Sequence, residues 1–241
     1  MQDKTPSYLY NVPWAPRNFC QATPLPRQKV VVLLRDPVAR AYSSFFKSFR
    51  GAHGVSKTRD GFTSIAEIDV AVANECGDLI FGESLEDFEA CCKTALSAFD
   101  SKYKPWMGCT VQGQGGFEIS HGDKRLAPIR GSIYHMQLRH WYRYVHPHDV
   151  LLFKSADLFA AMDDVAREIT EWVNAGPRVP WGQDPSEVPA QISQGAHKGV
   201  RHNHMPQTDK KMLEQTKQLL QSFFAPHNKK LEELVGREMH W

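Results

Sequence analysis

The 241-residue chain contains no apolar run close to the roughly 18 residues that a helix needs to cross a bilayer. Residues 1–10 have neither the basic nor the apolar segment of a signal peptide, so we expect a soluble chain without a targeting segment of its own. The charge is nearly balanced, with 29 Lys and Arg against 27 Asp and Glu. Because general nucleic-acid binders usually have a strong basic excess, we do not expect nucleic acid as a partner.

The five cysteines include no CxxC pair, so neither a structural zinc site nor another bound metal is expected. Cys91 and Cys92 lie side by side in a predicted helix, where they can serve as two small apolar residues. In an oxidising compartment, one of them could instead pair with Cys76 or Cys109. The odd number leaves at least one thiol free or bonded to another chain, so the cysteines do not decide the compartment.

The sequence also lacks a GxxxxGK(S/T) loop, an internal repeat and any low-complexity tract. Without that loop, whose backbone and lysine hold phosphates, a nucleotide kinase of α/β build is disfavoured. The composition, 41% hydrophobic and 23% charged, is that of an ordinary globular protein. The length allows a sizeable core, and we expect one domain over residues 1–241.

The clearest structural signal is an unbroken apolar run at residues 29–34. Such a run predicts a strand that is covered on both faces, as in a central parallel sheet. Asp36 can cap a following helix whose first residue is Pro37, where the missing N–H costs nothing. The sequence therefore predicts a strand, a tight turn and a helix through about residue 49.

The remaining pattern predicts an α/β fold with a central parallel sheet flanked by helices. Residues 50–64 and 101–129 have the composition of loops, and a second buried strand is expected at 149–153. Pro226 is expected to interrupt the last helix. The other helices are predicted at about 64–75, 84–99 (opened by Ser84), 133–145 and 158–173.

Arg35 and Ser43 are the candidate binding residues that this arrangement suggests. Ligands bind in the crevice beyond the carboxyl ends of parallel strands, and Arg35 follows directly after the first strand. Its planar guanidinium suits a phosphate. The alternative is that Arg35 pairs with a carboxylate while Ser43 simply lies in solvent.

The segment KVVVLLRDPVARAYS, residues 29–43, resembles the 3′-phosphate-binding strand and helix of one enzyme family. These are the sulfotransferases that use 3′-phosphoadenosine-5′-phosphosulfate (PAPS), and the likeness is to their heparan sulfate and chondroitin sulfate group. Further segments resemble the same family in the same order: residues 4–9, 131–153, 198–202 and 224–241.

The resemblance implies a role for individual residues. In that family the strand-end arginine and the helix serine hold the 3′-phosphate of the co-substrate, which corresponds to Arg35 and Ser43. A lysine near the transferred sulfate corresponds to Lys4, the expected catalytic residue. The loop that closes over the co-substrate corresponds to Lys198, Gly199, Arg201 and His202.

For the whole chain, the resemblance implies a P-loop-NTPase-like sulfotransferase fold and PAPS as co-substrate, without a metal. The expected activity is transfer of a sulfuryl group to a hydroxyl or amine of a carbohydrate chain, an acidic glycosaminoglycan by family resemblance. The expected location is the Golgi lumen, with membrane attachment only through an upstream anchor. Tyr134 and Trp141 are expected to be core residues, since helical spacing already explains them.

The chain also departs from the family pattern. The glycine-rich phosphosulfate loop and the glutamate base are expected upstream of Lys4, so the first strand–loop–helix unit is expected to be missing. Near residue 198 the arginine falls one position late, Asn203 replaces a proline, and no cysteine follows Cys109 to form the family's disulfide hairpin. The alternative function is a weak or inactive module that binds the desulfated nucleotide or a partner protein.

Three histidines near this loop, His197, His202 and His204, have no recognised metal-ligand spacing. We interpret them as a solvated or phosphate-facing cluster. His202 could substitute for the missing base.

Overall fold

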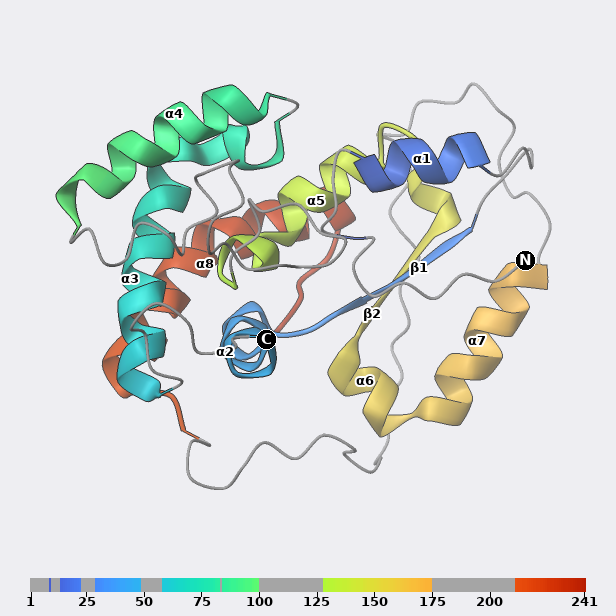
Figure 1. Ribbon diagram of the computed structural model, residues 1–241. Coiled ribbons are helices and arrows are strands. Elements are labelled where there is room, and N and C mark those ends of the chain that lie inside the picture. The colour runs from blue at the N-terminus through green and yellow to red at the C-terminus, as the bar shows by residue number, and fades with distance from the viewer. Residues whose placement is uncertain are drawn as a thin grey trace.

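The computed structural model describes residues 9, 14–22, 29–48, 58–82, 84–99, 128–174 and 211–241. Over these residues the protein is mixed α/β, mostly helical, with a small parallel sheet of two strands (Figure 1). The strands are β1 Val30–Leu34 and β2 Val150–Lys154. The helices are α1 Trp14–Ala22, α2 Pro37–Ser48, α3 Arg59–Cys76, α4 Leu85–Ala95, α5 Tyr134–Trp141, α6 Ser155–Ala160, α7 Met162–Asn174 and α8 Glu214–Val235. The 3₁₀ turns are η1 Gly77–Phe81, η2 Leu96–Ala98, η4 Arg130–Ser132 and η5 Pro147–Asp149.

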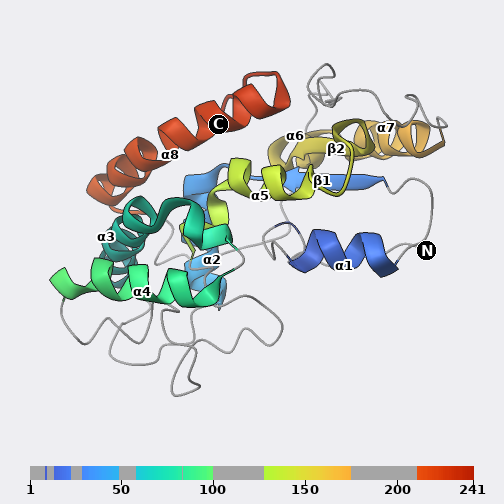
Figure 2. The ribbon, with the colours of Figure 1, turned by 90° about the horizontal axis from the view of Figure 1, so that it is seen from above.

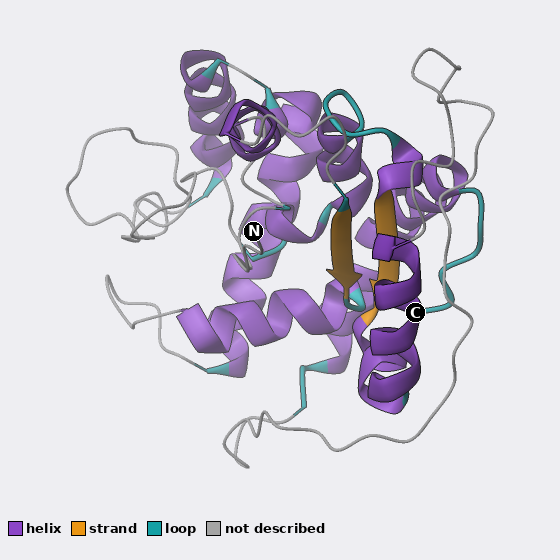
Figure 3. Ribbon diagram, turned by 90° about the vertical axis from the view of Figure 1, so that its right-hand side faces the viewer, coloured by secondary structure: helices purple, strands orange, loops and turns teal. Residues whose placement is uncertain are grey.

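The two strands pair in parallel, from Val30 opposite Val150 to Leu34 opposite Lys154. Both strands and their parallel direction were predicted from their apolar runs, and both are confirmed. Helix α1 lies on one side of the pair, while α6 and α7 lie on the other (Figures 1 and 2). The structure therefore has helices on both sides of a short parallel sheet (Figure 3).

The two strands are not covered equally. On one face of β2, Leu151 and Phe153 are buried in a small cluster with Trp172 of α7. Their paired residues on β1, Val31 and Leu33, are 38% and 48% exposed. The prediction that β1 is covered on both faces is therefore wrong, because no helix among the described residues packs over this part of its face.

The main core lies between α2, α3, α5 and α8. Phe45 of α2, Phe62 of α3 and Phe224 of α8 are at most 1% exposed, and the rings of Phe45 and Phe62 lie 5.3 Å apart. Tyr134 and Trp141 of α5 are 4% and 3% exposed, so the prediction that they are core residues is confirmed. These aromatic side chains join α2, which follows β1, to the helical half of the molecule.

Several helix predictions need correction at their ends. Helix α3 begins at Arg59, inside the predicted loop, because the Thr58 hydroxyl accepts a hydrogen bond from Gly61 N and caps it. The predicted helix over 158–173 is two helices that meet at Ala161, whose buried side chain belongs to the small cluster. Helix α1 was not predicted at all.

Helix α8 runs through Pro226 without interruption, contrary to the sequence-based prediction. A proline inside a helix removes one backbone hydrogen bond and crowds the preceding turn. Here the buried side chains of Phe223 and Phe224 before it, and of Leu231 after it, all enter the same core. Their burial stabilises the helix on both sides of the proline and offsets that cost.

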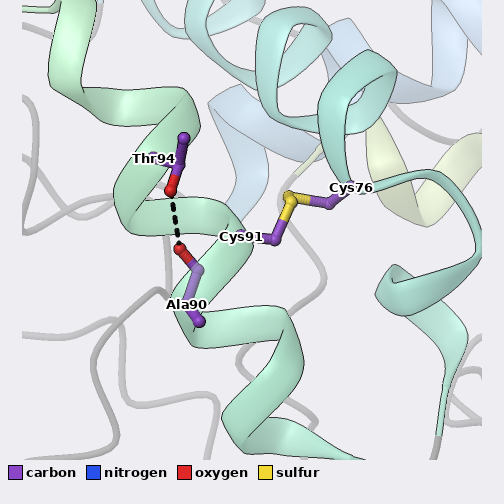
Figure 4. Close-up of a disulfide and its surroundings, with 4 residues drawn as sticks. All are labelled: Cys76, Ala90, Cys91 and Thr94. Atoms are coloured by element: carbon purple, nitrogen blue, oxygen red, sulfur yellow. Dashed lines mark hydrogen bonds between the residues drawn. A yellow bond between two sulfur atoms is a disulfide. The ribbon is translucent and has the colours of Figure 1, made fainter.

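A disulfide joins the end of α3 to the middle of α4 (Figure 4). Cys76 and Cys91 are bonded across 15 residues of sequence, with their Cα atoms 5.7 Å apart. Cys92 is also disulfide-bonded, and Cys20 is a free thiol. Cys91 and Cys92 therefore form disulfide bonds, rather than serving only as two small apolar residues.

Within the described parts of the chain, no helix is both long enough and apolar enough to span a bilayer.

Candidate functional site

The candidate site lies at the carboxyl end of the parallel pair. Leu34 and Lys154 are the last paired residues of β1 and β2, and Arg35 follows Leu34 directly. Two cationic residues therefore leave the sheet at the same edge, which is where ligands of parallel sheets bind. Lys154 is 22% exposed and its Nζ atom lies 3.8 Å from Oδ2 of Asp157, at the start of α6.

The turn between β1 and α2 is fixed by Asp36. Its Oδ1 atom accepts hydrogen bonds from Val38 N at 2.8 Å and Ala39 N at 3.1 Å, which confirms the predicted cap. These two N–H groups are the donors that a helix amino terminus would otherwise offer to a phosphate. An anion at this turn must therefore be held chiefly by side chains.

Arg35 provides such a side chain. It is exposed, and its guanidinium makes no ion pair or hydrogen bond with any residue that the structure describes. The alternative prediction, that Arg35 pairs with a carboxylate, therefore has no support among the described residues. Its backbone carbonyl, in contrast, accepts a hydrogen bond of 2.9 Å from the Tyr134 hydroxyl.

Ser43 lies two turns along α2, on the half-buried stripe that also carries Arg40. Helical residues three apart are neighbours on one face, so the two side chains lie over adjacent turns. Arg40 Nη1 donates to Ser132 Oγ at 2.9 Å, and Ser132 in turn donates to the carbonyl of Pro128 at 3.1 Å. Arg40 is therefore a structural partner of η4, a role that the sequence did not reveal.

The segment before α5 is held by a buried ion pair. Arg130 and Asp69 are both 0% exposed, and Arg130 Nε lies 2.6 Å from Asp69 Oδ1. The other carboxylate oxygen, Oδ2, accepts from the backbone N–H groups of Ile129 and Arg130. Burying two charges is tolerated only with such additional hydrogen bonds, and they fix η4 against α3.

Tyr134 connects this segment to the turn. Its ring packs against Trp241 with the centroids 6.3 Å apart, and its hydroxyl reaches the carbonyl of Arg35. Burial raises the pKa of Tyr134 to about 12, against an opposing effect of Arg40 and of the Arg35 carbonyl. The phenol is therefore protonated, and a hydrogen-bond donor, at neutral pH.

The structure brings together only part of the predicted site. Arg35 and Ser43 lie on the same strand–turn–helix unit, as the sequence predicted. Lys4, and the loop residues Lys198, Gly199, Arg201 and His202, fall outside the described residues, as do His197 and His204. No cluster of three metal-ligating side chains occurs in the described ranges.

Lys154 is a candidate that the sequence reasoning missed. The signal was available, because a lysine follows the second predicted buried strand directly. Since neighbouring parallel strands end on the same side of a sheet, this lysine could be expected at the same carboxyl end as Arg35. Together these residues can bind an anion, and no side chain described at this edge is an evident general base.

No protein-family model matches the chain, and no curated protein matches it significantly.

Proposed function

We propose that this chain binds a 3′-phosphorylated adenosine nucleotide and acts as a PAPS-dependent carbohydrate sulfotransferase with a P-loop-NTPase-like fold. The observation that carries the proposal is the exposed Arg35 guanidinium, without an ion-pair partner among the described residues, at the carboxyl end of a parallel strand pair. Arg35 is followed by helix α2, which Asp36 caps and which carries Ser43. This is the unit whose sequence resembles the 3′-phosphate site of that family.

Two further features support the proposal. Lys154 adds a second positive charge at the carboxyl end of the strand pair, which favours the binding of a doubly charged phosphate there. The Cys76–Cys91 disulfide agrees with folding in an oxidising compartment, such as the Golgi lumen proposed for the chain. An acidic carbohydrate chain is the proposed acceptor, and Lys4 the proposed cation beside the transferred sulfate.

The alternative is a module that binds the desulfated nucleotide but transfers sulfate poorly or not at all. One observation favours it: Asp36, the carboxylate next to Arg35, already accepts two backbone hydrogen bonds through Oδ1. It is poorly placed to take the proton of an acceptor hydroxyl. A lost general base costs roughly 10²–10⁴-fold in rate.

Calorimetric titration with 3′-phosphoadenosine-5′-phosphate (PAP) tests the binding proposal. Arg35→Ala removes a charge-assisted contact, so PAP should bind roughly ten- to a hundredfold more weakly, while AMP, which lacks the 3′-phosphate, should bind the two proteins equally. Ser43→Ala should weaken PAP binding by a smaller factor. Equal PAP affinities for the parent and Arg35→Ala would contradict the assignment.

Sulfate transfer from labelled PAPS to a panel of glycosaminoglycans then separates the enzyme from the alternative. Turnover that Arg35→Ala abolishes supports the sulfotransferase. PAP binding without turnover on any acceptor supports the binding module.

A further inference from the structure

The hydroxyl of Tyr134 and the carbonyl of Arg35 form a hydrogen bond between residues 99 positions apart in the sequence. Resting on the proposed function, we propose that Tyr134 is a positioning residue that orients Arg35 toward the 3′-phosphate of the nucleotide. Tyr134 is 4% exposed and does not itself reach the exposed edge. Tyr134 acts through the backbone of Arg35, whose side chain is exposed there.

The bond falls at the point where it has most effect on the Arg35 side chain. A peptide group is planar, so fixing the carbonyl of Arg35 also fixes the N–H of Asp36 and the Cα atoms of both residues. Asp36 is held independently by its two hydrogen bonds to α2. The Arg35 carbonyl lies between Leu34 in the ladder and Asp36 in the cap, and the Tyr134 hydroxyl holds it in place.

Tyr134 is itself held from several sides. The preceding 3₁₀ turn is anchored to α3 by the buried Arg130–Asp69 pair and to α2 by the bond from Arg40 to Ser132. The ring also packs against Trp241. A donor that is fixed in this way loses little entropy when it orients a partner, which is what a preorganised binding site requires.

A second reading is that the hydroxyl simply needs a partner because it is buried. A tyrosine at the other end of α5 shows that burial alone does not impose one. The Tyr142 hydroxyl is also buried, its pKa is also raised to about 12 by burial, and it has no hydrogen-bond partner among the residues that the structure describes. Tyr142→Phe is therefore a matched control that removes a hydroxyl without removing a hydrogen bond.

The experiment compares Tyr134→Phe and Tyr142→Phe with the parent, using PAP and AMP as calorimetric probes and thermal melting as a check on folding. Tyr134→Phe should bind PAP about three- to tenfold more weakly, the range of one hydrogen bond, with AMP binding unchanged. Tyr142→Phe should match the parent with both nucleotides. In an Arg35→Ala background, Tyr134→Phe should have no further effect on PAP, because the group that it orients is gone.

The outcomes separate this inference from the proposed function. If the parent does not distinguish PAP from AMP, the proposed function fails. If the parent does, but folded Tyr134→Phe keeps the parental ratio of PAP to AMP affinity, the positioning role is wrong. Equal losses for the two nucleotides would also overturn it, since that is the result of a merely structural change.

Should Tyr134→Phe not fold, Trp241→Ala replaces it in the comparison, because it loosens the packing of the Tyr134 ring and leaves the hydroxyl in place. A reduced ratio of PAP to AMP affinity would then support the inference, and an unchanged ratio would overturn it.

Discussion

Leu34 and Lys154 are paired at the last rung of the two parallel strands, and Arg35 follows Leu34 directly, so both cations lie at the carboxyl end of the sheet. Because successive side chains of a strand point to opposite faces, Lys154 continues the face of Leu34 and Arg35 comes one position beyond it. Two positive charges at one end of the sheet both attract an anion that binds there. Asp157 offsets part of the charge of Lys154 at 3.8 Å. A bound phosphate would offset the remaining positive charge of Arg35 and Lys154.

We therefore predict that Lys154→Gln weakens PAP binding roughly fivefold at about 50 mM salt, and less at about 300 mM, where screening is stronger. Calorimetric titration at the two salt concentrations measures this. Lys93→Gln on α4 is the control, since it removes the same charge far from the sheet (Figure 1). An equal effect of the two variants would mean that only the net charge matters.

The Cys76–Cys91 disulfide should contribute to stability. Closing a loop across 15 residues restricts the unfolded chain, and the expected contribution is about 3 kcal/mol. The double variant Cys76→Ala, Cys91→Ala should lose about this much free energy of unfolding in urea. Cys20→Ser, which alters a free thiol, should unfold like the parent. A double variant as stable as the parent would show that the bond adds no net stability.

His135 of α5 and His227 of α8 should make the stability depend on pH. Their rings are stacked with the centroids 5.1 Å apart, and within the described parts of the chain neither Nδ1 atom has a hydrogen-bond partner. Burial lowers the pKa of His135 to about 3, with further lowering by His227, Lys230 and Arg139. Burial, and then Lys230, lower the pKa of His227 to about 4.

Both pKa values are below that of an unfolded histidine, so between about pH 4 and 6.5 the unfolded chain binds more protons. The free energy of unfolding should therefore be highest above about pH 6.5 and should fall toward pH 5. Allowing for solvent screening of these partly accessible rings, we expect a loss of about 1–2 kcal/mol. Urea unfolding at several pH values measures it.

His227→Gln should reduce this pH dependence by about half, because one of the two rings no longer titrates. His240→Asn is the control, since the His240 side chain is 75% exposed and its positive φ suits asparagine. If His227→Gln retained the full parental slope, other groups would be responsible for it.

Pro226→Ala should stabilise the protein, because α8 is helical on both sides of the proline. Alanine restores the missing backbone hydrogen bond, although it also frees the unfolded chain. We expect a gain of about 1–2 kcal/mol in free energy of unfolding, with PAP affinity unchanged. Gln221→Ala, a change at an exposed site of the same helix, should have little effect. A destabilised Pro226→Ala would mean that the proline fits a bend that the helix needs.

The sequence was most informative where local rules decide the structure. The apolar run before Arg35 predicted β1, and Asp36 with Pro37 predicted the start of α2, because a cap and a proline act within a few residues. The pairing of β1 with β2 followed from two buried runs that need a common sheet.

It was least informative where distant residues decide the structure. The exposure of Val31 and Leu33 depends on which part of the sheet the helices cover, and the helical state of Pro226 depends on aromatic packing around it. The hydrogen bond from Tyr134 to Arg35 joins two residues whose separate patterns indicate only a core position and a strand end. No periodicity encodes such a contact.

The buried pair of Asp69 and Arg130 predicts which positions of this chain tolerate substitution. Asp69 lies in the middle of α3 and contacts no residue of the candidate site, yet it fixes the turn that presents Ser132 and Tyr134. Its loss would remove the carboxylate that pairs with the buried Arg130 guanidinium, at a cost of about 3–5 kcal/mol. A survey of substitutions would therefore find Asp69 as intolerant of change as a ligand-binding residue, and the exposed α3 residues Glu67, Asn74 and Glu75 as variable.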